Sequence, residues 1–296
     1  MAPLNIVCDD EKAAAGTGRD SAAGAVARPR AASRSRSPAG QPPPIPAGAA
    51  ALARWPGTGE AAGRRGLVGF DFDCTLTTRH FFKVFAHGYL QGDMAAHPHC
   101  ADFATFCGAR RLPTKIGAVP KGIWAGNAIG AALEAFCVKA GEAAFRELFR
   151  ETFLGGESRI QLLATSLARL RALGAETAIV TAGSSGAVLR ALGTVPELRP
   201  FFPPAMVWDV SQARHKAGSV MAMKALMLRD LRPDANPSLL VDDSLLHDPP
   251  PAWALETASV DAVAFPTGQL PYEGQGLGAE ALELIAQRLQ IGASSC

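Results

Sequence analysis

The sequence contains no long, uninterrupted apolar run. Its most apolar window, Ala125 to Val138, is interrupted by Asn127 and Glu134. A helix that spans a membrane needs about 20 consecutive, mostly apolar residues. We therefore expect no membrane-spanning segment and no membrane partner.

Net charge is also low, at +2 for 296 residues. Residues 1–65 hold nine Lys or Arg against five Asp or Glu, so the remainder of the chain carries a net charge of −2. That remainder shows no basic patch interleaved with aromatic residues, which is the usual mark of a nucleic-acid surface. We expect no specific nucleic-acid partner, and the charge alone indicates no other.

The six cysteines show none of the close spacings of a disulfide framework. One of them, Cys74, directly follows an acidic residue. We interpret all six as free thiols in a reducing compartment and therefore predict a cytoplasmic location.

Residues 1–62 have few large apolar side chains and are rich in Ala, Gly, Pro, Arg and Ser. Such a composition cannot bury enough apolar surface to offset the entropy lost on ordering, which predicts a disordered tail. The alternative is a transit peptide, which would place the protein in a plastid or mitochondrion. The acidic cluster at 9–11 argues against it, because transit peptides are poor in acids.

The remainder of the chain alternates between apolar strand patterns and amphipathic helix patterns. After a first strand that ends at Phe70, we predict strands at 177–181, 205–209, 238–243 and 258–265, and helices at 157–173, 184–192, 216–231 and 279–289. Single helices between strands indicate βαβ units. The predicted fold class is α/β, with a three-layer Rossmann-like parallel sheet formed by residues 63–78 and 155–296.

Residues 79–154 interrupt this pattern after the first strand. Helical spacing of apolar residues at 79–90 and 126–153 flanks a stretch at 91–122 that is rich in Pro and Gly, which we predict to be irregular. The segment is predicted to be a small helical insert. It either closes over a site as a cap or packs on the flank of the sheet without such a role.

The most informative stretch begins where the first strand ends. The apolar run 67–70 leads directly into Asp71, and Asp73 follows one residue later. In an open parallel sheet, ligands bind at the carboxyl ends of the strands. Two carboxylates there repel one another unless a cation lies between them. A hard divalent cation with oxygen ligands, most simply Mg²⁺, meets that need.

Other polar residues follow the later strands. Thr181 ends the second predicted strand, Asp242 and Asp243 end the fourth, and Lys216 begins the helix before it. Backbone amides at 182–185, at the start of a helix, could receive an anion. Hydroxyls, cations and metal-bound carboxylates all stabilise the charge of a phosphoryl group during its transfer.

Four segments in this order resemble the motifs of the haloacid dehalogenase-like (HAD) hydrolase superfamily, over residues 66–270. They are Asp71-Phe-Asp-Cys-Thr-Leu-Thr77, Thr181, Lys216 and Leu239-Leu-Val-Asp-Asp243. For the third motif Lys224 is an alternative. We prefer Lys216, because it lies at a predicted helix start after a loop.

The resemblance implies a role for each strand-end acid. Asp71 would be the nucleophile that forms an aspartyl-phosphate, and Asp73 would protonate the leaving oxygen and then activate water. Asp71, the backbone carbonyl of Asp73 and Asp243 would hold Mg²⁺, with Asp242 in support.

The resemblance also implies the phosphate contacts and the reaction. Thr181 and Lys216 would hold the transferring phosphoryl group, aided by the amide of Ala182. Asp at position 73 implies a phosphatase rather than a dehalogenase, acting on a small phosphorylated metabolite beneath a cap. A phosphomutase and a catalytically idle scaffold that binds partners remain the alternatives. The sequence does not indicate an oligomeric state.

Overall fold

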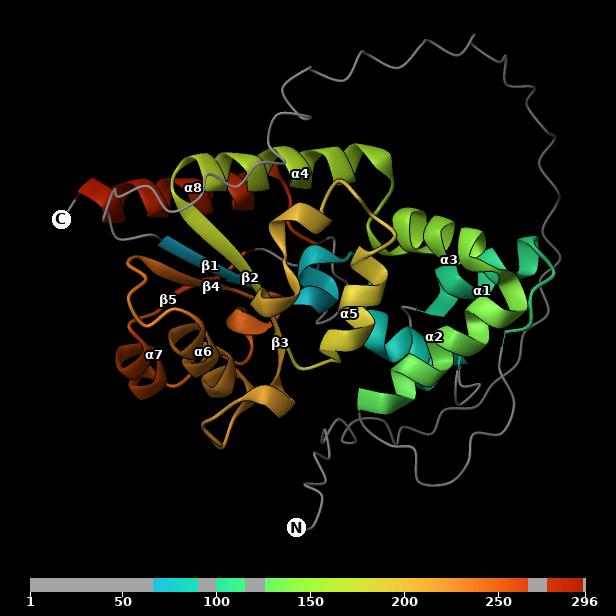
Figure 1. The fold of residues 1–296 in the computed structure, drawn as a ribbon, viewed down its shortest axis with the longest axis horizontal. Helices are drawn as coiled ribbons and strands as arrows, with labels where there is room; N and C mark the ends of the chain where they lie inside the picture. Colours follow the sequence, from blue (N-terminus) through green and yellow to red (C-terminus); the bar gives the residue numbers. More distant parts are fainter. Residues whose placement is uncertain (1–65, 90–99, 115–125, 266–275, 295–296) are drawn as a thin grey trace, which may run out of the picture. The chain divides into compact units, whose positions relative to one another are not determined.

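The first strand, β1 (Gly66–Phe70), lies in the middle of a parallel sheet. The computed structural model describes residues 66–89, 100–114, 126–265 and 276–294. Within these ranges the sheet has five strands in the order β3-β2-β1-β4-β5, and every pair is parallel. The other strands are β2 (Ala175–Thr181), β3 (Val207–Asp209), β4 (Ser238–Val241) and β5 (Asp261–Val263) (Figure 1). The predicted α/β fold class is confirmed.

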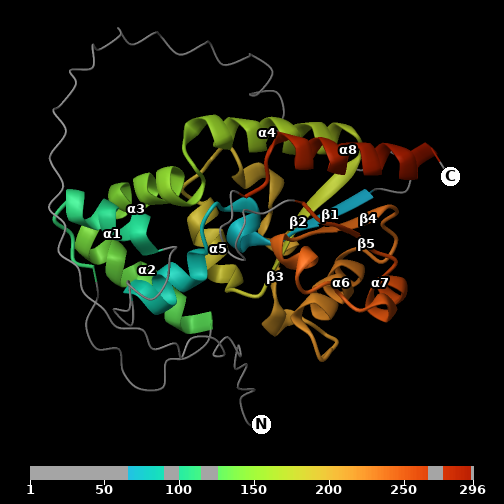
Figure 2. The same ribbon diagram turned by 180° about the vertical axis from the view of Figure 1, so that it is seen from behind.

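Helices cover both faces of this sheet, which explains why all of β1 is buried. One face carries α4 (Glu157–Ala172) and α8 (Ala279–Ser294), and the other carries α6 (Val220–Leu231) and α7 (Ala252–Ala258), as Figures 1 and 2 both show. Successive strand residues face opposite sides. Val68 accordingly packs in the apolar cluster of α4 and α8, and Leu67 in that of α6.

The insert after β1 is largely helical where it is described. Its helices are a segment at Lys83–Tyr89, α1 (Cys100–Ala109), α2 (Gly126–Ala140), α3 (Glu142–Leu148) and a last turn at Phe149–Phe153. The prediction of irregular structure over 91–122 is wrong at α1. That helix buries Phe103, Phe106 and Cys107, and this burial outweighs the weak local signal.

Aromatic rings join the insert to the segment that directly follows β1. The ring of Phe72, directly after the nucleophile candidate, stacks on Phe149 with centroids 6.2 Å apart, and Phe81 lies 5.8 Å from Phe72. The backbone N–H of Thr78 also donates to the carbonyl of Phe153 at 2.6 Å. The two ends of the insert are therefore held together beside the carboxyl end of β1. Whether the insert closes over a site remains a prediction.

Other differences from the sequence prediction concern element boundaries and one further helix. Helix α6 begins at Val220 rather than at Lys216, because Ser219 caps it by accepting from the N–H of Ala222 at 3.1 Å. Helix α7 was not predicted, and β5 is shorter than the predicted strand at 258–265.

The predicted tail at 1–62 lies outside the described residues, so its disorder and the cytoplasmic location stay predictions. In the described part of the chain, no helix combines the length and the apolar character that crossing a membrane requires.

Candidate active site

Strand alternation determines where each site aspartate points. Asp71 and Asp242 directly follow β1 and β4, and both keep an extended backbone. The N–H of Asp71 donates to the carbonyl of Val241 at 2.8 Å, so the strand pairing continues to this point. Side chains two residues apart share a face of a sheet. Asp71 therefore points to the α6 side, like Leu67, and so does Asp242, like Leu240.

Helix α6 supplies the cation that these two carboxylates meet. Lys224 is 3% exposed. Its Nζ lies 2.6 Å from Asp71 Oδ1 and 2.6 Å from Asp242 Oδ2. One helical turn further on, Leu228 packs so closely over Gly69 that a Cβ atom on that glycine would overlap it. The missing side chain at position 69 lets α6 approach β1 and brings Lys224 to Asp71.

Of the two lysines considered, the structure places Lys224 beside the candidate carboxylates and leaves Lys216 outside this cluster. Lys216 is exposed in the loop before α6. The prediction placed Lys216 at the start of the helix. The helix begins later, at Val220 after the Ser219 cap, so Lys216 remains in the preceding loop. A single lysine within the run Val-Met-Ala-Met-Lys-Ala-Leu-Met-Leu was the signal in the sequence that pointed to Lys224.

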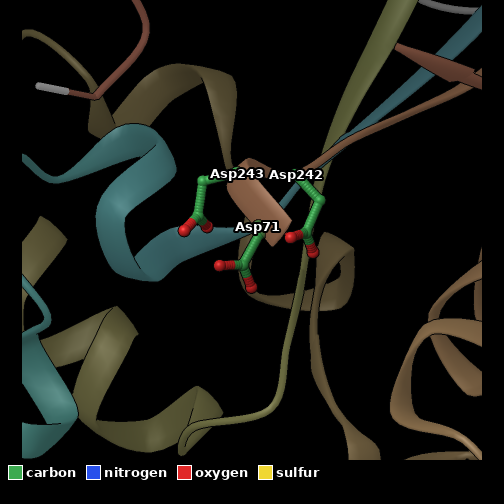
Figure 3. Close-up of side chains that lie close together, drawn as sticks. All are labelled: Asp71, Asp242 and Asp243. Atoms are coloured by element: carbon green, nitrogen blue, oxygen red, sulfur yellow. The ribbon is translucent and has the colours of Figure 1, made fainter. Parts of the chain in front are cut away.

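Asp242 and Asp243 are adjacent but use their oxygens differently. Both oxygens of Asp242 have partners, since Oδ2 accepts from Lys224 and Oδ1 accepts from the N–H of Ser244 at 2.9 Å. Asp243, the first residue of the 3₁₀ turn that follows β4, accepts from the Thr75 hydroxyl through Oδ1 at 3.1 Å. No bond recorded within the described residues reaches Oδ2 of Asp71 or Oδ2 of Asp243. Figure 3 shows the three carboxylates converging.

This group could hold a metal ion. One carboxylate oxygen from each of Asp71, Asp242 and Asp243 lies within 4.8 Å of the others, and all three residues are buried. Oxygen donors of this type suit Mg²⁺ or another hard cation. Asp71 and Asp243 each keep one carboxylate oxygen for which no bond is recorded within the described residues. Both oxygens of Asp242 are already bonded, one of them to Lys224.

The pKa shifts show that Lys224 alone does not balance the cluster. Burial, together with the neighbouring carboxylates, raises the pKa of Asp71 even though Lys224 lowers it. Burial and Asp242 raise the pKa of Asp243 to about 6. Asp242, beside Lys224, has a lowered pKa, and the pKa of Lys224 itself is raised by its two carboxylate partners. A bound cation would relieve this surplus of negative charge.

Asp73 points away from this cluster. Its Oδ1 accepts from the backbone N–H of Phe82 at 3.0 Å and lies 3.2 Å from Nδ1 of His80. A Cβ atom on Gly183 would lie 3.4 Å from Asp73 Oδ2 and 3.3 Å from Thr181 Oγ1. Burial opposes ionisation of Asp73, but His80 and the Phe82 N–H lower its pKa overall. Asp73 Oδ2 and Thr181 Oγ1 thus both lie beside Gly183.

The turn after β2 contains the predicted phosphate contacts. Thr181 is buried, and its Oγ1 accepts from the N–H of Gly183 at 3.0 Å, which leaves the hydroxyl proton to donate elsewhere. Ala182 is exposed. Helix α5 (Ser185–Leu192) begins here, but the Ser185 N–H already donates to Oδ2 of Asp209 at 2.9 Å. Of the amides predicted to receive an anion, those of Gly183 and Ser185 therefore have partners within the chain.

Sequence reasoning missed three residues that shape the site: Thr75, which holds Asp243; His80, beside Asp73; and Arg159. The Arg159 guanidinium, largely buried, donates to the carbonyl of Leu76 at 2.8 Å and to that of Leu154 at 3.0 Å. It thereby ties the loop after Asp73 to the end of the insert. Only the threonine lies in the motif, and contacts of the other two depend on the tertiary fold.

Comparison with known proteins gives matches among solved structures only. No protein-family model matches the sequence, and no curated protein matches it. One similar structure is that of cytosolic 5′-nucleotidase IIIB bound to cytidine, at 13% identity, with a TM-score of 0.37, over 77% of this chain and 86% of that one. Another is a HAD family hydrolase from Deinococcus radiodurans R1 with bound phosphate and sodium, at 17% identity, with a TM-score of 0.35, over 77% and 89%.

Proposed function

We propose that this chain is a HAD-like phosphatase that hydrolyses a phosphomonoester through an aspartyl-phosphate on Asp71. The observation that carries the proposal is the state of the Asp71 carboxylate. Oδ1 is fixed by Lys224 at 2.6 Å, while Oδ2 lies at the carboxyl edge of the sheet without a recorded partner among the described residues. A fixed, buried carboxylate with one open oxygen is suited to nucleophilic attack.

The reaction proceeds in two balanced steps. Asp71 Oδ2 forms a bond to phosphorus, the bond from phosphorus to the alcohol oxygen breaks, and Asp73 gives that oxygen a proton. Water then attacks phosphorus, its proton passes to Asp73, and the Asp71–phosphorus bond breaks to release phosphate. Because its pKa is lowered, Asp73 is ionised in the free protein. The proton that Asp73 gives to the alcohol is therefore taken up when the substrate binds, and the proton that Asp73 takes from water is released to solvent when phosphate leaves.

Asp243, the backbone carbonyl of Asp73 and the Asp71 oxygen that does not attack phosphorus would hold Mg²⁺. When bound, the ion would offset the negative charge of the phosphoryl oxygens and of the attacking carboxylate. Thr75 orients Asp243 by a bond in each direction: its hydroxyl donates to Oδ1 at 3.1 Å and accepts from the Asp243 N–H at 3.0 Å. Lys224 and Thr181 would donate to the phosphoryl oxygens, and the exposed Ala182 amide would add a third donor.

The helical insert favours a small substrate. Phe82, in its first turn, is partly buried, and a Cβ atom on Gly183 would lie 4.0 Å from the Phe82 ring. The insert therefore lies beside Gly183, next to Asp73 and Thr181, where the alcohol part of a phosphomonoester would leave. We infer that it acts as a cap that selects small phosphorylated metabolites.

The test is phosphate release from p-nitrophenyl phosphate in Mg²⁺ by the wild type, Asp71→Asn and Asp248→Asn. Asp248 is an exposed acid, which makes it a matched control. We expect Asp71→Asn to lose all measurable activity, because an amide is a poor nucleophile, and Asp248→Asn to retain it. Full activity in Asp71→Asn would overturn the proposal. A phosphorylated product without free phosphate would instead indicate a phosphomutase.

A further inference from the structure

The carboxylate of Asp73 is held by one of its two oxygens. The N–H of Phe82 and Nδ1 of His80 both contact Oδ1, at 3.0 Å and 3.2 Å. Oδ2 instead faces the turn after β2, beside Gly183 and Thr181. The two contacts come from the first turn of the insert, seven and nine residues after Asp73. The insert thus determines the rotation of this carboxylate.

Nδ1 is the nitrogen of the His80 ring that faces Asp73. That nitrogen also lies 3.4 Å from the backbone N–H of Lys83, which would require it to be an acceptor. The contact with Asp73 is shorter and involves a charged oxygen, and hydrogen bonds to charged groups are the stronger ones. We therefore assign the ring proton to Nδ1, from which it would donate to Asp73. The His80 side chain is 19% exposed and that of Asp73 is 11% exposed, so water competes little for this bond.

We propose that His80 is a positioning residue that holds Asp73 Oδ1 so that Oδ2 faces the leaving oxygen of the substrate. This inference rests on the proposed phosphatase activity. His80 touches neither the substrate nor the phosphorus in this scheme. Without it, the Phe82 N–H alone would restrain the carboxylate, and Oδ2 would spend less time in the orientation for proton transfer. Misorientation of this kind is costly, because proton transfer needs a short, directed contact.

The experiment compares two esters whose leaving groups differ in their need for a proton. An alkyl phosphate releases a strongly basic alkoxide and depends on the acid, whereas p-nitrophenyl phosphate releases a stable phenolate. The variants are His80→Leu and His80→Asn, which have similar size. Only the asparagine can donate a hydrogen bond from a position near that of Nδ1. The readout is kcat/KM, which reports the steps up to phosphoryl transfer to Asp71.

We expect His80→Leu to lower kcat/KM at least tenfold for the alkyl ester and about threefold or less for the aryl ester. His80→Asn should stay within about threefold of the wild type for both esters. In an Asp73→Asn background, His80→Leu should not change the ratio between the esters any further, because the two residues act as one unit.

Each other result counts against the inference. Equal losses for both esters in His80→Leu would show a structural role only, and no loss would show no role. Continued change of the ratio in the Asp73→Asn background would show that His80 does not act through Asp73. If the wild type releases phosphate from neither ester, the proposed function itself fails and the inference fails with it.

Discussion

The Nζ atom of Lys224 lies 2.6 Å from Oδ1 of Asp71, and both side chains are at least 93% buried. An equal contact of 2.6 Å joins the same ammonium to Asp242, so one cation is shared between two carboxylates. Removal of one partner of a buried ion pair typically costs about 3–5 kcal/mol, because it leaves an uncompensated buried charge. We therefore expect substitution of this lysine to affect both stability and activity.

The first prediction separates Lys224 from Lys216. Lys224→Gln should lower kcat/KM for p-nitrophenyl phosphate by at least about 100-fold, since an electrostatic contact to the phosphoryl group is lost. It should also lower the free energy of unfolding by about 3 kcal/mol in urea titrations. Lys216→Gln, at an exposed position, should change the stability by no more than about 0.5 kcal/mol and leave the activity intact. Comparable losses in both variants would contradict the assignment.

The second prediction concerns the metal and separates the two adjacent aspartates. Removal of divalent ions with a chelator should abolish phosphate release, and added Mg²⁺ should restore it and raise Tm, because ligands that bind only the folded state stabilise it. Asp243→Asn should need at least about tenfold more Mg²⁺ for half-maximal activity, because an open carboxylate ligand is lost. Asp242→Asn should keep the wild-type Mg²⁺ requirement but unfold at a lower temperature, since its carboxylate binds Lys224 rather than the ion.

The outcome that would contradict this division is an equal loss of the Mg²⁺ response in both variants. All three clustered aspartates would then have to be ligands. The concentration of Mg²⁺ at half-maximal activity and the Tm shift at saturating Mg²⁺ measure the two effects independently.

Local patterns in the sequence predicted most strands of the sheet but missed some helices of the described chain. The apolar run of β1 and the strand ahead of Asp242 are unambiguous, because a strand buried on both faces reads as continuously apolar. Helix α1 and α7 were missed. Phe103 in α1 is buried against the rings of Phe85 and Tyr89, a contact between segments that are not adjacent in sequence.

Local sequence patterns likewise indicated only some of the candidate site residues, and the positions of the others depend on tertiary contacts. Asp71, Asp73 and Asp243 could be chosen as candidates because strand ends are readable in sequence. The choice between two lysines required the start of α6, which depends on the Ser219 cap. His80 follows no local rule, since its contact with Asp73 depends on the path of the chain after the first strand.

The third prediction tests the close approach of α6 to β1. A Cβ atom at position 69 would overlap the Leu228 side chain. Gly69→Ala should therefore destabilise the protein by about 2 kcal/mol through overpacking. Leu228→Ala removes the obstructing atoms, so the cost of Gly69→Ala should largely disappear in that background. A double-mutant cycle of urea titrations should give a coupling of about 1–2 kcal/mol. Simple additivity of the two changes would show that the approach of the helix does not depend on this glycine.

The fourth prediction concerns Cys74, which has a left-handed backbone with φ of 59° and ψ of 0°. Its N–H donates to the Thr77 hydroxyl at 3.0 Å, and its side chain is 1% exposed. For a residue with a Cβ atom this conformation costs about 1–2 kcal/mol, whereas glycine adopts it readily. Both Cys74→Ala and Cys74→Gly remove the sulfur, but only the second removes the Cβ atom. We expect the glycine variant to be more stable than the alanine variant by about 1 kcal/mol in urea titrations. Equal stability, or a more stable alanine variant, would show that the turn between Asp73 and Thr77 is not strained at this residue.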